Sequence, residues 1–171
     1  HAYDFSINNQ LIEIVQDYIY LGVKISSRKT WHMAGGLHRK SSGMKNMFAL
    51  ESNCTSNEIW TVDLRMKLFN SIVIPTAIYG SEMWGPSSNA IWDGDIGLER
   101  IQKLYLRSSI HIRVTTPYHI ILEEFAEVLL EIHALQTLIS FLQRISRLPN
   151  TRLSYKAIEV SRSMANGWFS Q

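Results

Sequence analysis

Large apolar residues recur at helical spacing through the middle of the chain, and they limit most strongly what the chain can fold into. They are Trp60, Leu64, Leu68, Ile72 and Tyr79. This spacing places all of them on one side of an α-helix. We therefore predict a long helix from about Asn57 to Met83.

Local signals predict where this helix begins and where it bends. Thr55, with Glu58 three residues later, has the sequence of a capping box, in which two side chains satisfy backbone donors of the first turn. Pro75 lacks a backbone N–H and its ring collides with the preceding turn. We therefore predict that Thr55 opens the helix and that the helix is kinked near Pro75.

The remaining elements follow from the same kind of pattern. Leu11–Val15 and Tyr18–Ile25 are rich in Ile, Val and Tyr and predict two short strands that pair in an antiparallel hairpin. Helices are predicted over His38–Glu51, Leu98–Ile112, a segment capped by Thr116 with Pro117 at its first position, Ile132–Ile145 and Leu153–Met164. The predicted fold class is mainly α: a short N-terminal antiparallel β-hairpin followed by about five helices.

Composition excludes several classes of protein. Of the 171 residues, 46% are hydrophobic, which is enough to form a core. The one cysteine, Cys54, allows no internal disulfide. The longest apolar run is shorter than a membrane span, so we expect no membrane partner. Because the chain starts at His1 rather than Met, we expect it to be cut from a larger protein.

Charge is distributed unevenly although the formal net charge is only +2. No acidic residue occurs between Tyr18 and Leu50, and none between Ile132 and Ile158. The first stretch holds Lys24, Arg28, Lys29, Arg39, Lys40 and Lys45, and the second holds Arg144, Arg147, Arg152 and Lys156. Separated basic stretches suit contact with a polyanion. The alternative is that these stretches are only solvated helix surface.

Residues able to do chemistry are present but are not arranged in any known catalytic pattern. Asp93-Gly94-Asp95 places two carboxylates close together, but the rest of a calcium loop is missing, which favours a polar loop. No pair of histidines has the spacing of a zinc motif, and no nucleophile elbow or phosphate-binding loop occurs. An independent hydrolase or nuclease is therefore disfavoured. Trp60, Trp84 and Trp92 have spacings that favour core positions over base stacking.

Several segments together resemble the reverse transcriptase of non-LTR (LINE-type) retrotransposons. Tyr20-Leu21-Gly22 resembles the hairpin that closes the palm of that family. Leu68–Gly85, which contains Tyr-Gly-Ser-Glu-x-Trp-Gly, resembles its long helix, and Leu98–Arg107 resembles a later segment of the form Ile-Glu-x-x-Gln-x-x-Phe-Leu-Arg. The resemblance extends from about Leu11 to Ile158 and covers the part of the enzyme after the catalytic site.

The resemblance implies a division of the chain and a set of nucleic-acid contacts. Residues 1–30 would end the palm with a β-hairpin, residues 31–86 would form thumb-like helices, and residues 87–171 would form a helical connector. Trp60, Leu68, Ile72, Tyr79 and Trp84 would build the thumb core. The implied contacts to the template–primer duplex are Tyr20, Leu21, Gly22, Lys24, Arg28, Lys29, Arg39, Lys40 and Lys45. The other implied partner is the remainder of the reverse transcriptase, and the family role implies a nuclear location.

The resemblance also implies what the chain lacks. The family's polymerase site needs a Tyr/Phe-x-Asp-Asp turn and an earlier aspartate to hold two Mg²⁺ ions. This chain has no Asp-Asp pair, so we expect no catalytic residue, no cofactor within it and no polymerase activity on its own. The alternative function is a helical protein–protein interaction module without a nucleic-acid role.

The sequence departs from the family pattern at helix ends. His111 occupies the position of a family glycine, where a positive φ is often required. Ala126 and Leu129 occupy the positions of a Gly and a Pro that separate two late helices. Because both helix-breaking residues are replaced, the sequence predicts helix from Phe125 to Leu130. These replacements are typical of a degenerate element copy.

Overall fold

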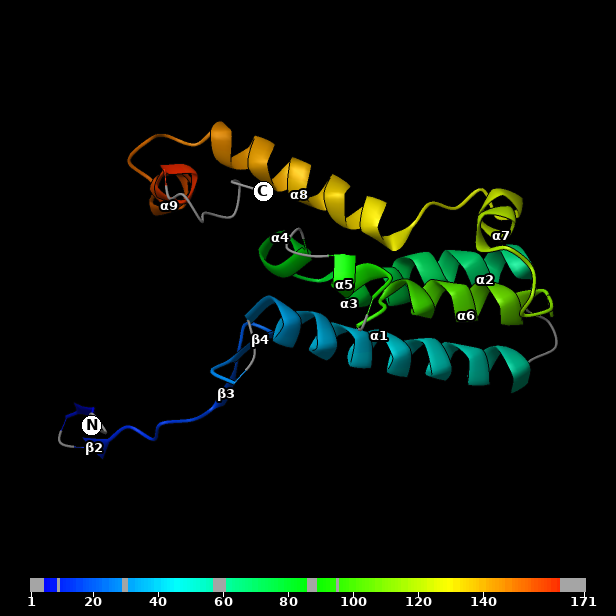
Figure 1. Cartoon of the computed structure of the whole chain (residues 1–171), viewed down its shortest axis with the longest axis horizontal. Coiled ribbons are helices and arrows are strands. Elements are labelled where there is room, and N and C mark those ends of the chain that lie inside the picture. The colour runs from blue at the N-terminus through cyan, green and yellow to red at the C-terminus, as the bar shows by residue number, and fades with distance from the viewer. Residues whose placement is uncertain are drawn as a thin grey trace.

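The structure is a computed structural model that describes residues 5–8, 10–28, 31–56, 61–85, 89–94 and 96–163. Two short antiparallel hairpins come first, and helices make up most of the remaining described chain (Figure 1). The predicted mainly α fold class is therefore confirmed. The helices outnumber the prediction because the long central helix is divided and because short helices lie between the predicted ones.

The hairpin forms at a different place from the predicted one. Strands β3 (Asp17–Tyr20) and β4 (Val23–Ser26) pair with each other, with Tyr20 opposite Val23. The predicted second strand thus folds back on itself, because Leu21 and Gly22 form a two-residue turn with φ of 46° and 82°. Leu11–Val15 is not its partner: Leu11 belongs to β2 (Gln10–Leu11), which pairs with β1 (Ser6–Ile7).

Helix α1 (Trp31–Ser56) contains the predicted helix and is longer at both ends. The glycines of α1 lie where other segments approach the helix closely, and they do not interrupt it. A Cβ atom on Gly43 would lie 2.8 Å from Ile101 Cδ1 and 3.0 Å from Ala77 Cβ. The absence of a side chain at Gly43 therefore lets α1 pack directly against α3 (Ile74–Ile78) and α6 (Glu99–Ser109).

The long central helix starts later than predicted. Thr55 lies inside α1 and Glu58 lies outside the described residues, so Thr55 does not open this helix. Instead Thr61 caps α2 (Val62–Leu68), and its side chain accepts a hydrogen bond from the Leu64 N–H.

Proline 75 changes the helix without ending it. A π-helical turn, η1 (Phe69–Val73), joins α2 to α3, and the Ile74 N–H bonds to the Phe69 carbonyl. The Thr76 hydroxyl donates to the Ile72 carbonyl at 2.7 Å, next to the point where Pro75 supplies no N–H. The helix ends at Ile78, and the chain turns at Gly80, with φ 72°, before α4 (Ser81–Trp84).

The second half of the chain is also helical. Its elements are α5 (Asn89–Trp92), α6, α7 (Tyr118–Glu124), α8 (Leu130–Ser146) and α9 (Leu153–Ser163). Pro117 is the N-cap of α7 rather than its first residue, and Thr116 therefore does not cap it. The predicted helix from Phe125 to Leu130 is wrong, because Ala126 has a φ of 51° and the chain leaves the helix there.

The core lies where α1, η1, α3, α4, α5 and α6 meet. Its fully enclosed side chains include Phe69, Val73, Trp84, Ile101 and Tyr105. The core prediction is confirmed for Trp84 and Trp92. Trp60 lies outside the described residues.

Leu68 is partly buried and packs against this core. The core prediction is wrong for Ile72 and Tyr79, which are exposed, as is Leu64. On the predicted apolar side of α8, Ile132, Leu135 and Ile139 are also exposed, whereas Ile145 is buried as predicted. Leu130 and Ala134 of the same helix are buried as well.

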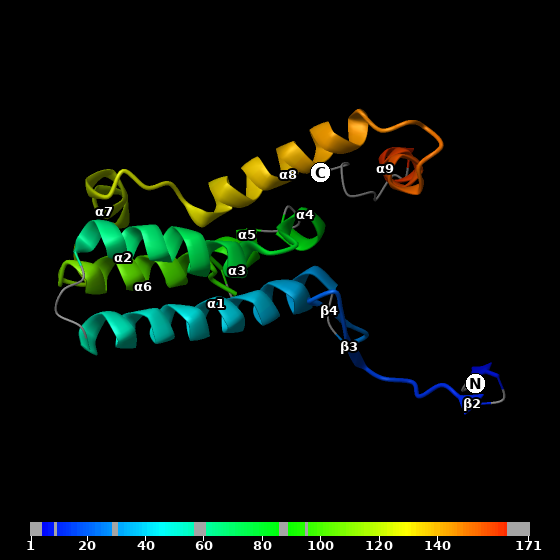
Figure 2. The ribbon, with the colours of Figure 1, turned by 180° about the vertical axis from the view of Figure 1, so that it is seen from behind.

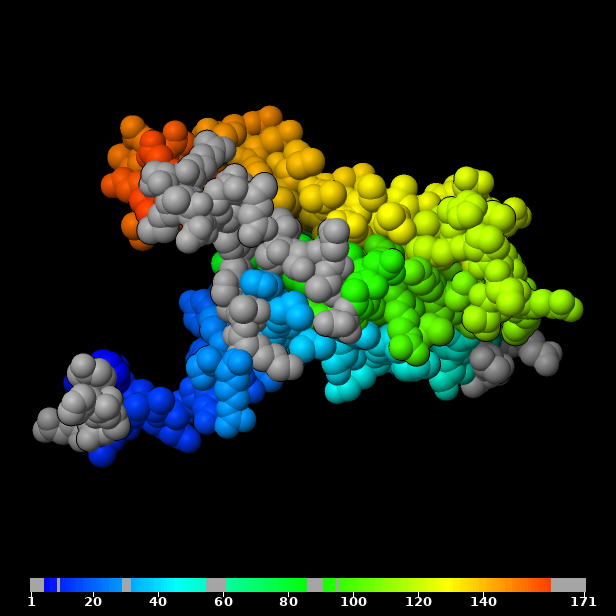
Figure 3. Space-filling view, viewed as in Figure 1, coloured from blue at the N-terminus to red at the C-terminus, as the bar shows by residue number. Residues whose placement is uncertain are grey.

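The helices form three layers. Helix α1 lies on one side, α8 lies on the other, and α2 to α6 lie between them in both views (Figures 1 and 2). The β3–β4 hairpin and α9 lie at the same end of the molecule, whereas α7 lies at the opposite end. The first strands project away from the helical body (Figure 3). None of the described helices is long and apolar enough to span a membrane.

Candidate nucleic-acid interface

The β3–β4 turn is held by side chains from two distant helical segments. The Arg39 guanidinium of α1 donates to the Gly22 carbonyl, and the Tyr79 hydroxyl donates to the Leu21 carbonyl at 3.2 Å. The Arg39 guanidinium carbon also lies 4.6 Å from the centre of the Tyr79 ring. Burial lowers the pKa of Arg39 from its ordinary value. Arg39 and Tyr79 together form what we call the turn clamp.

A glycine at each side of the clamp permits this approach. A Cβ atom on Gly22 would lie 2.7 Å from a guanidinium nitrogen of Arg39, and one on Gly80 would lie 3.0 Å from Val23 Cγ2. The Trp84 indole N–H donates to the Tyr79 carbonyl at 3.2 Å. The Tyr-Leu-Gly and Tyr-Gly-Ser-Glu-x-Trp-Gly segments, far apart in sequence, are therefore parts of one contact.

The predicted contact residues on the hairpin itself are accessible. Tyr20 and Leu21 are 59% and 74% exposed. Lys24 pairs with Asp17 across the hairpin at 3.1 Å, so an acid from just outside the basic stretch partly neutralises it. The hydrogen bonds from Ser26 and Lys24 lower the pKa of Asp17.

The predicted cations do not share one surface. Lys45 and Arg28 are exposed, whereas Lys40 is partly buried and Arg39 is bonded within the chain. Lys40 and Lys45 are five residues apart, which places them on different sides of α1. Lys29 lies outside the described residues. The charges of Lys24 and Lys45 both act on the imidazole of His38, but the whole predicted set does not lie on one surface.

The outer face of α1 adds His38, Ser41 and Ser42 to the predicted contact residue Lys45. His38, Ser41, Ser42 and Lys45 recur at spacings of three, four and seven on this helix, opposite the side that carries Gly43 and Met47. His38 is partly exposed, and Ser41 and Lys45 are exposed. We call these four residues, with Lys24 of β4 beside them, the α1 track. The helical period within the basic stretch is the signal that would have found it.

Electrostatics on the α1 track are positive. Burial lowers the pKa of His38, and the charges of Arg39, Lys24 and Lys45 lower it further. All three charges that act on this imidazole are cations. A surface of hydroxyls and cations of this kind matches the oxygen atoms of a phosphate backbone.

The second basic stretch is also exposed, at the end of the molecule that carries the hairpin. Arg144 and Arg147 lie at the end of α8, and Arg152 and Lys156 lie at the start of α9. Arg144 lies over the Phe141 ring at 5.6 Å. Because the inner sides of α8 and α9 face each other, these cations point toward solvent.

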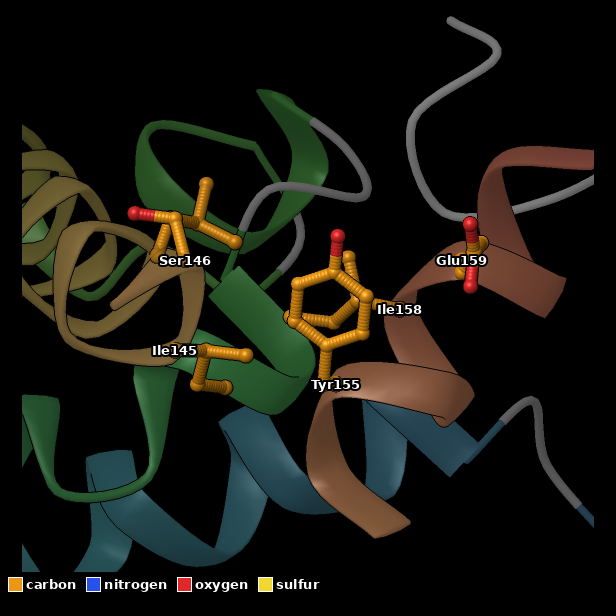
Figure 4. A pocket seen from close by; sticks show the side chains of 6 residues that line it. Ile145, Ser146, Tyr155, Ile158 and Glu159 are labelled. Carbon is orange, nitrogen blue, oxygen red and sulfur yellow. The ribbon is translucent and has the colours of Figure 1, made fainter. Parts of the chain in front are cut away.

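A small pocket separates α8 from α9 (Figure 4). Ile145, Tyr155 and Ile158 line it with Leu142, Ser146 and Glu159. In Figure 4 the apolar side chains of the two helices approach each other across it. The pocket is part of the packing between the two helices, and its lining has no cluster of groups suited to catalysis.

A buried polar network joins α6 to α7 and to the start of α8. The Glu99 carboxylate is 3% exposed and accepts the Glu131 N–H of α8 at 2.9 Å. The Tyr118 hydroxyl lies 2.7 Å from Gln102 Oε1 and 3.3 Å from Glu99, and the Gln102 amide donates to the Val128 carbonyl at 2.9 Å. Burial raises the pKa of Glu99. We call Glu99, Gln102 and Tyr118 the buried clamp.

No metal-binding cluster occurs among the described residues: none of their His, Cys, Asp and Glu side chains gather in groups of three. Asp93 pairs with Lys103 at 2.8 Å. Asp95, the other carboxylate of the predicted polar loop, lies outside the described residues.

Comparison with known proteins gives a coarse result. The chain is 34% identical over 73 residues to a Caenorhabditis elegans protein named as transposon-derived. This match covers 43% of the chain and 25% of the relative, so the chain spans only about a quarter of that protein's length. No protein-family model and no solved structure matches the chain. The similarity points to a transposable element as the origin of the chain.

Proposed function

We propose that this chain is a non-catalytic part of a retrotransposon reverse transcriptase that helps to hold the template–primer duplex. The observation that carries the proposal is the turn clamp beside the α1 track. It joins the two most specific segments of the family resemblance, and it puts the hairpin next to a cationic helix face. The transposon-derived relative agrees with such an origin.

The backbone supports the resemblance where the sequence departs from it. His111 and Ala126 stand at positions where the family has glycine, and they have φ of 52° and 51°. Leu129 stands at a family proline and has φ −57° and ψ 146°, which proline also adopts. These are the dihedral angles that glycine and proline at the same positions would adopt, which supports the proposal.

The proposed contact is electrostatic and independent of base sequence. Lys45, Arg28 and Lys24 would meet phosphates, while Tyr20 and Leu21 at the tip would support the primer end. Arg39 would act within the turn clamp rather than on phosphate. As the family resemblance implies, Mg²⁺ chemistry would belong to the rest of the enzyme.

Salt dependence tests the proposal. Binding of the full chain to a short RNA–DNA duplex is titrated at several salt concentrations, for wild type and for Arg28→Ala/Lys45→Ala. Each phosphate contact contributes a log–log slope of about −0.9, so the double variant should flatten the slope by up to about two units. The matched control is Lys67→Ala/Arg113→Ala, which removes two exposed cations away from the track and should keep the wild-type slope.

Primer extension tests the non-catalytic part. With an RNA template and Mg²⁺ or Mn²⁺, we expect the purified chain to incorporate no nucleotide above a heat-treated control. Incorporation that copurifies with the chain would contradict this.

A protein–protein interaction module remains the second candidate. It is favoured by the apolar side chains that the hairpin exposes, which are Tyr18, Ile19, Tyr20, Leu21 and Ile25. Under this function, duplex binding would be absent or would show equal slopes in the track variant and its control.

A further inference from the structure

His38 lies within the positive surface of the α1 track, but its side chain carries no permanent charge. It lies on α1 between the hairpin and Lys45, one and two turns away from Ser42 and Lys45 along the same side. The Ser42 hydroxyl bonds to the His38 carbonyl at 3.1 Å, which leaves the imidazole outside that contact. The ring is partly exposed, so a ligand on the track can reach it.

The charged groups around His38 come from two elements. Arg39 and Lys45 belong to α1, and Lys24 belongs to β4, where Asp17 of β3 lies behind it in an ion pair. In the free chain these cations oppose a fourth positive charge. A bound phosphate backbone reverses the sign of this environment, because it neutralises the cations and offers oxygen acceptors to an imidazolium.

We infer that His38 is a proton-dependent phosphate contact, so that nucleic-acid binding on the α1 track takes up a proton and strengthens as the pH falls. The inference rests on the proposed function, since it requires a polyanion on the track. It adds His38 to the contact residues of that site and makes binding there depend on pH. Neutral imidazole contributes little to a phosphate, whereas imidazolium donates a charge-assisted hydrogen bond.

The direction follows from linkage. His38 has a lowered pKa in the free chain, and contact with phosphate raises it in the complex. Between these two values the complex holds one more proton than the free chain, so affinity rises as pH falls through this window. One linked proton gives at most about a tenfold gain in affinity for each pH unit.

The test measures binding of a fluorescent RNA–DNA duplex to the full chain between about pH 5 and 8 at fixed ionic strength. Wild type should bind more tightly toward the acid end, by up to about tenfold per unit. His38→Gln should bind weakly with a flat profile through this range. His38→Lys should bind tightly with an equally flat profile, because its charge is permanent. His119→Gln, which removes an exposed histidine of α7 at the far end of the molecule, should keep the wild-type profile.

The possible outcomes distinguish failure of this inference from failure of the proposed duplex-binding function. Salt-dependent binding with the same pH profile in wild type and His38→Gln would overturn the inference and leave the proposed function standing. A pH dependence lost in His119→Gln would also overturn it. Absence of salt-dependent binding at every pH would remove the proposed function and the inference together. Circular dichroism of each variant checks that the helices are retained.

Discussion

Two chain reversals in this protein place a non-glycine residue in the left-handed region and are then held by side chains from a distant helix. One is the β3–β4 turn, with Leu21 at φ 46° and the turn clamp. The other is the α7–α8 junction, with Ala126 at φ 51° and the buried clamp. Both clamps satisfy backbone groups, but the first faces solvent and the second lies inside the molecule.

The difference in burial decides what each clamp can do. Water can replace the Arg39 and Tyr79 contacts when they open, because Tyr79 is 51% exposed. Nothing replaces the Glu99 carboxylate, which is the partner of the first turn of α8. We therefore expect loss of the turn clamp to open the hairpin locally. Loss of the buried clamp should instead lower the stability of the whole fold.

The largest expected effect is that of Glu99→Ala. It leaves the Glu131 N–H without its partner in a buried site, and it should lower the free energy of unfolding by about 2 to 4 kcal/mol. Denaturant titration measures the loss. Glu124→Ala, an exposed carboxylate on α7, is the control and should change the stability little. Equal losses in the two variants would mean that the buried clamp does not hold α8.

The protonation of Glu99 sharpens this prediction. Burial raises the pKa of Glu99 in the folded chain above its ordinary value of 4.5, so the folded chain takes up this proton before the unfolded chain does. The contribution of Glu99 to stability therefore rises as pH falls from the raised pKa toward 4.5 and is lost as pH rises through that window. Glu99→Gln should flatten the pH dependence in this window while losing less stability than Glu99→Ala, because an amide oxygen still accepts one N–H.

Arg39→Ala should have the next largest effect, and a local one. It removes the donor to Gly22 and the contact with the Tyr79 ring, with an expected cost of about 1 to 2 kcal/mol in hairpin opening. Hydrogen exchange at the β3–β4 amides should speed up while α6 and α8 keep their protection. Arg39→Lys keeps the charge without the planar donor, and should restore only part of the protection. Uniform loss of protection from exchange across all helices would show that Arg39 stabilises the whole fold rather than the hairpin alone.

Ala126→Gly should stabilise the chain by up to about 1 kcal/mol. Alanine pays a steric cost at positive φ that glycine avoids, and this exceeds the extra entropy that glycine loses on folding. Ala157→Gly, at an exposed position inside α9, is the matched control and should destabilise by a similar amount. Thermal unfolding of the two variants measures the contrast, and a shift of the same sign in both would contradict the prediction.

Leu21→Asn should have the smallest effect. Asparagine tolerates the left-handed region better than leucine does, so the turn should gain about 0.5 kcal/mol. The clamp carbonyl remains, and exchange of the hairpin amides should slow slightly. Faster exchange would show that the Leu21 side chain contributes more to the turn than its backbone costs.

Sequence patterns predicted the helices well where they depend on local spacing. Leu98, Ile101 and Tyr105 are buried as the period of α6 requires. The patterns did not predict which side of a helix packs against a neighbouring element. In α8, Ile132 and Leu135 are exposed because the opposite side, with Leu130 and Ala134, packs against the core. Period alone does not reveal which side has a neighbour.

The candidate site was predicted by charge but not by arrangement. Counting cations in the stretch from Lys24 to Lys45 treated Arg39 like Lys45, although one supports the hairpin and the other faces solvent. His38 was not included in this count because it carries no permanent charge. The strand pattern missed the turn at Leu21–Gly22 because leucine seldom opens such a turn, whereas the family resemblance implied a hairpin at Tyr20-Leu21-Gly22.

The π-helical turn ahead of Pro75 makes the hairpin contact depend on the type of helical turn as well as on residue identity. Such a turn holds one residue more than the α-helical turn it replaces. If the same residues closed as an ordinary α-helix, everything after Val73 would be rotated by about 100° relative to α2. Tyr79 would then leave the Leu21 carbonyl, although every residue of both recognisable segments would still be present in the gene.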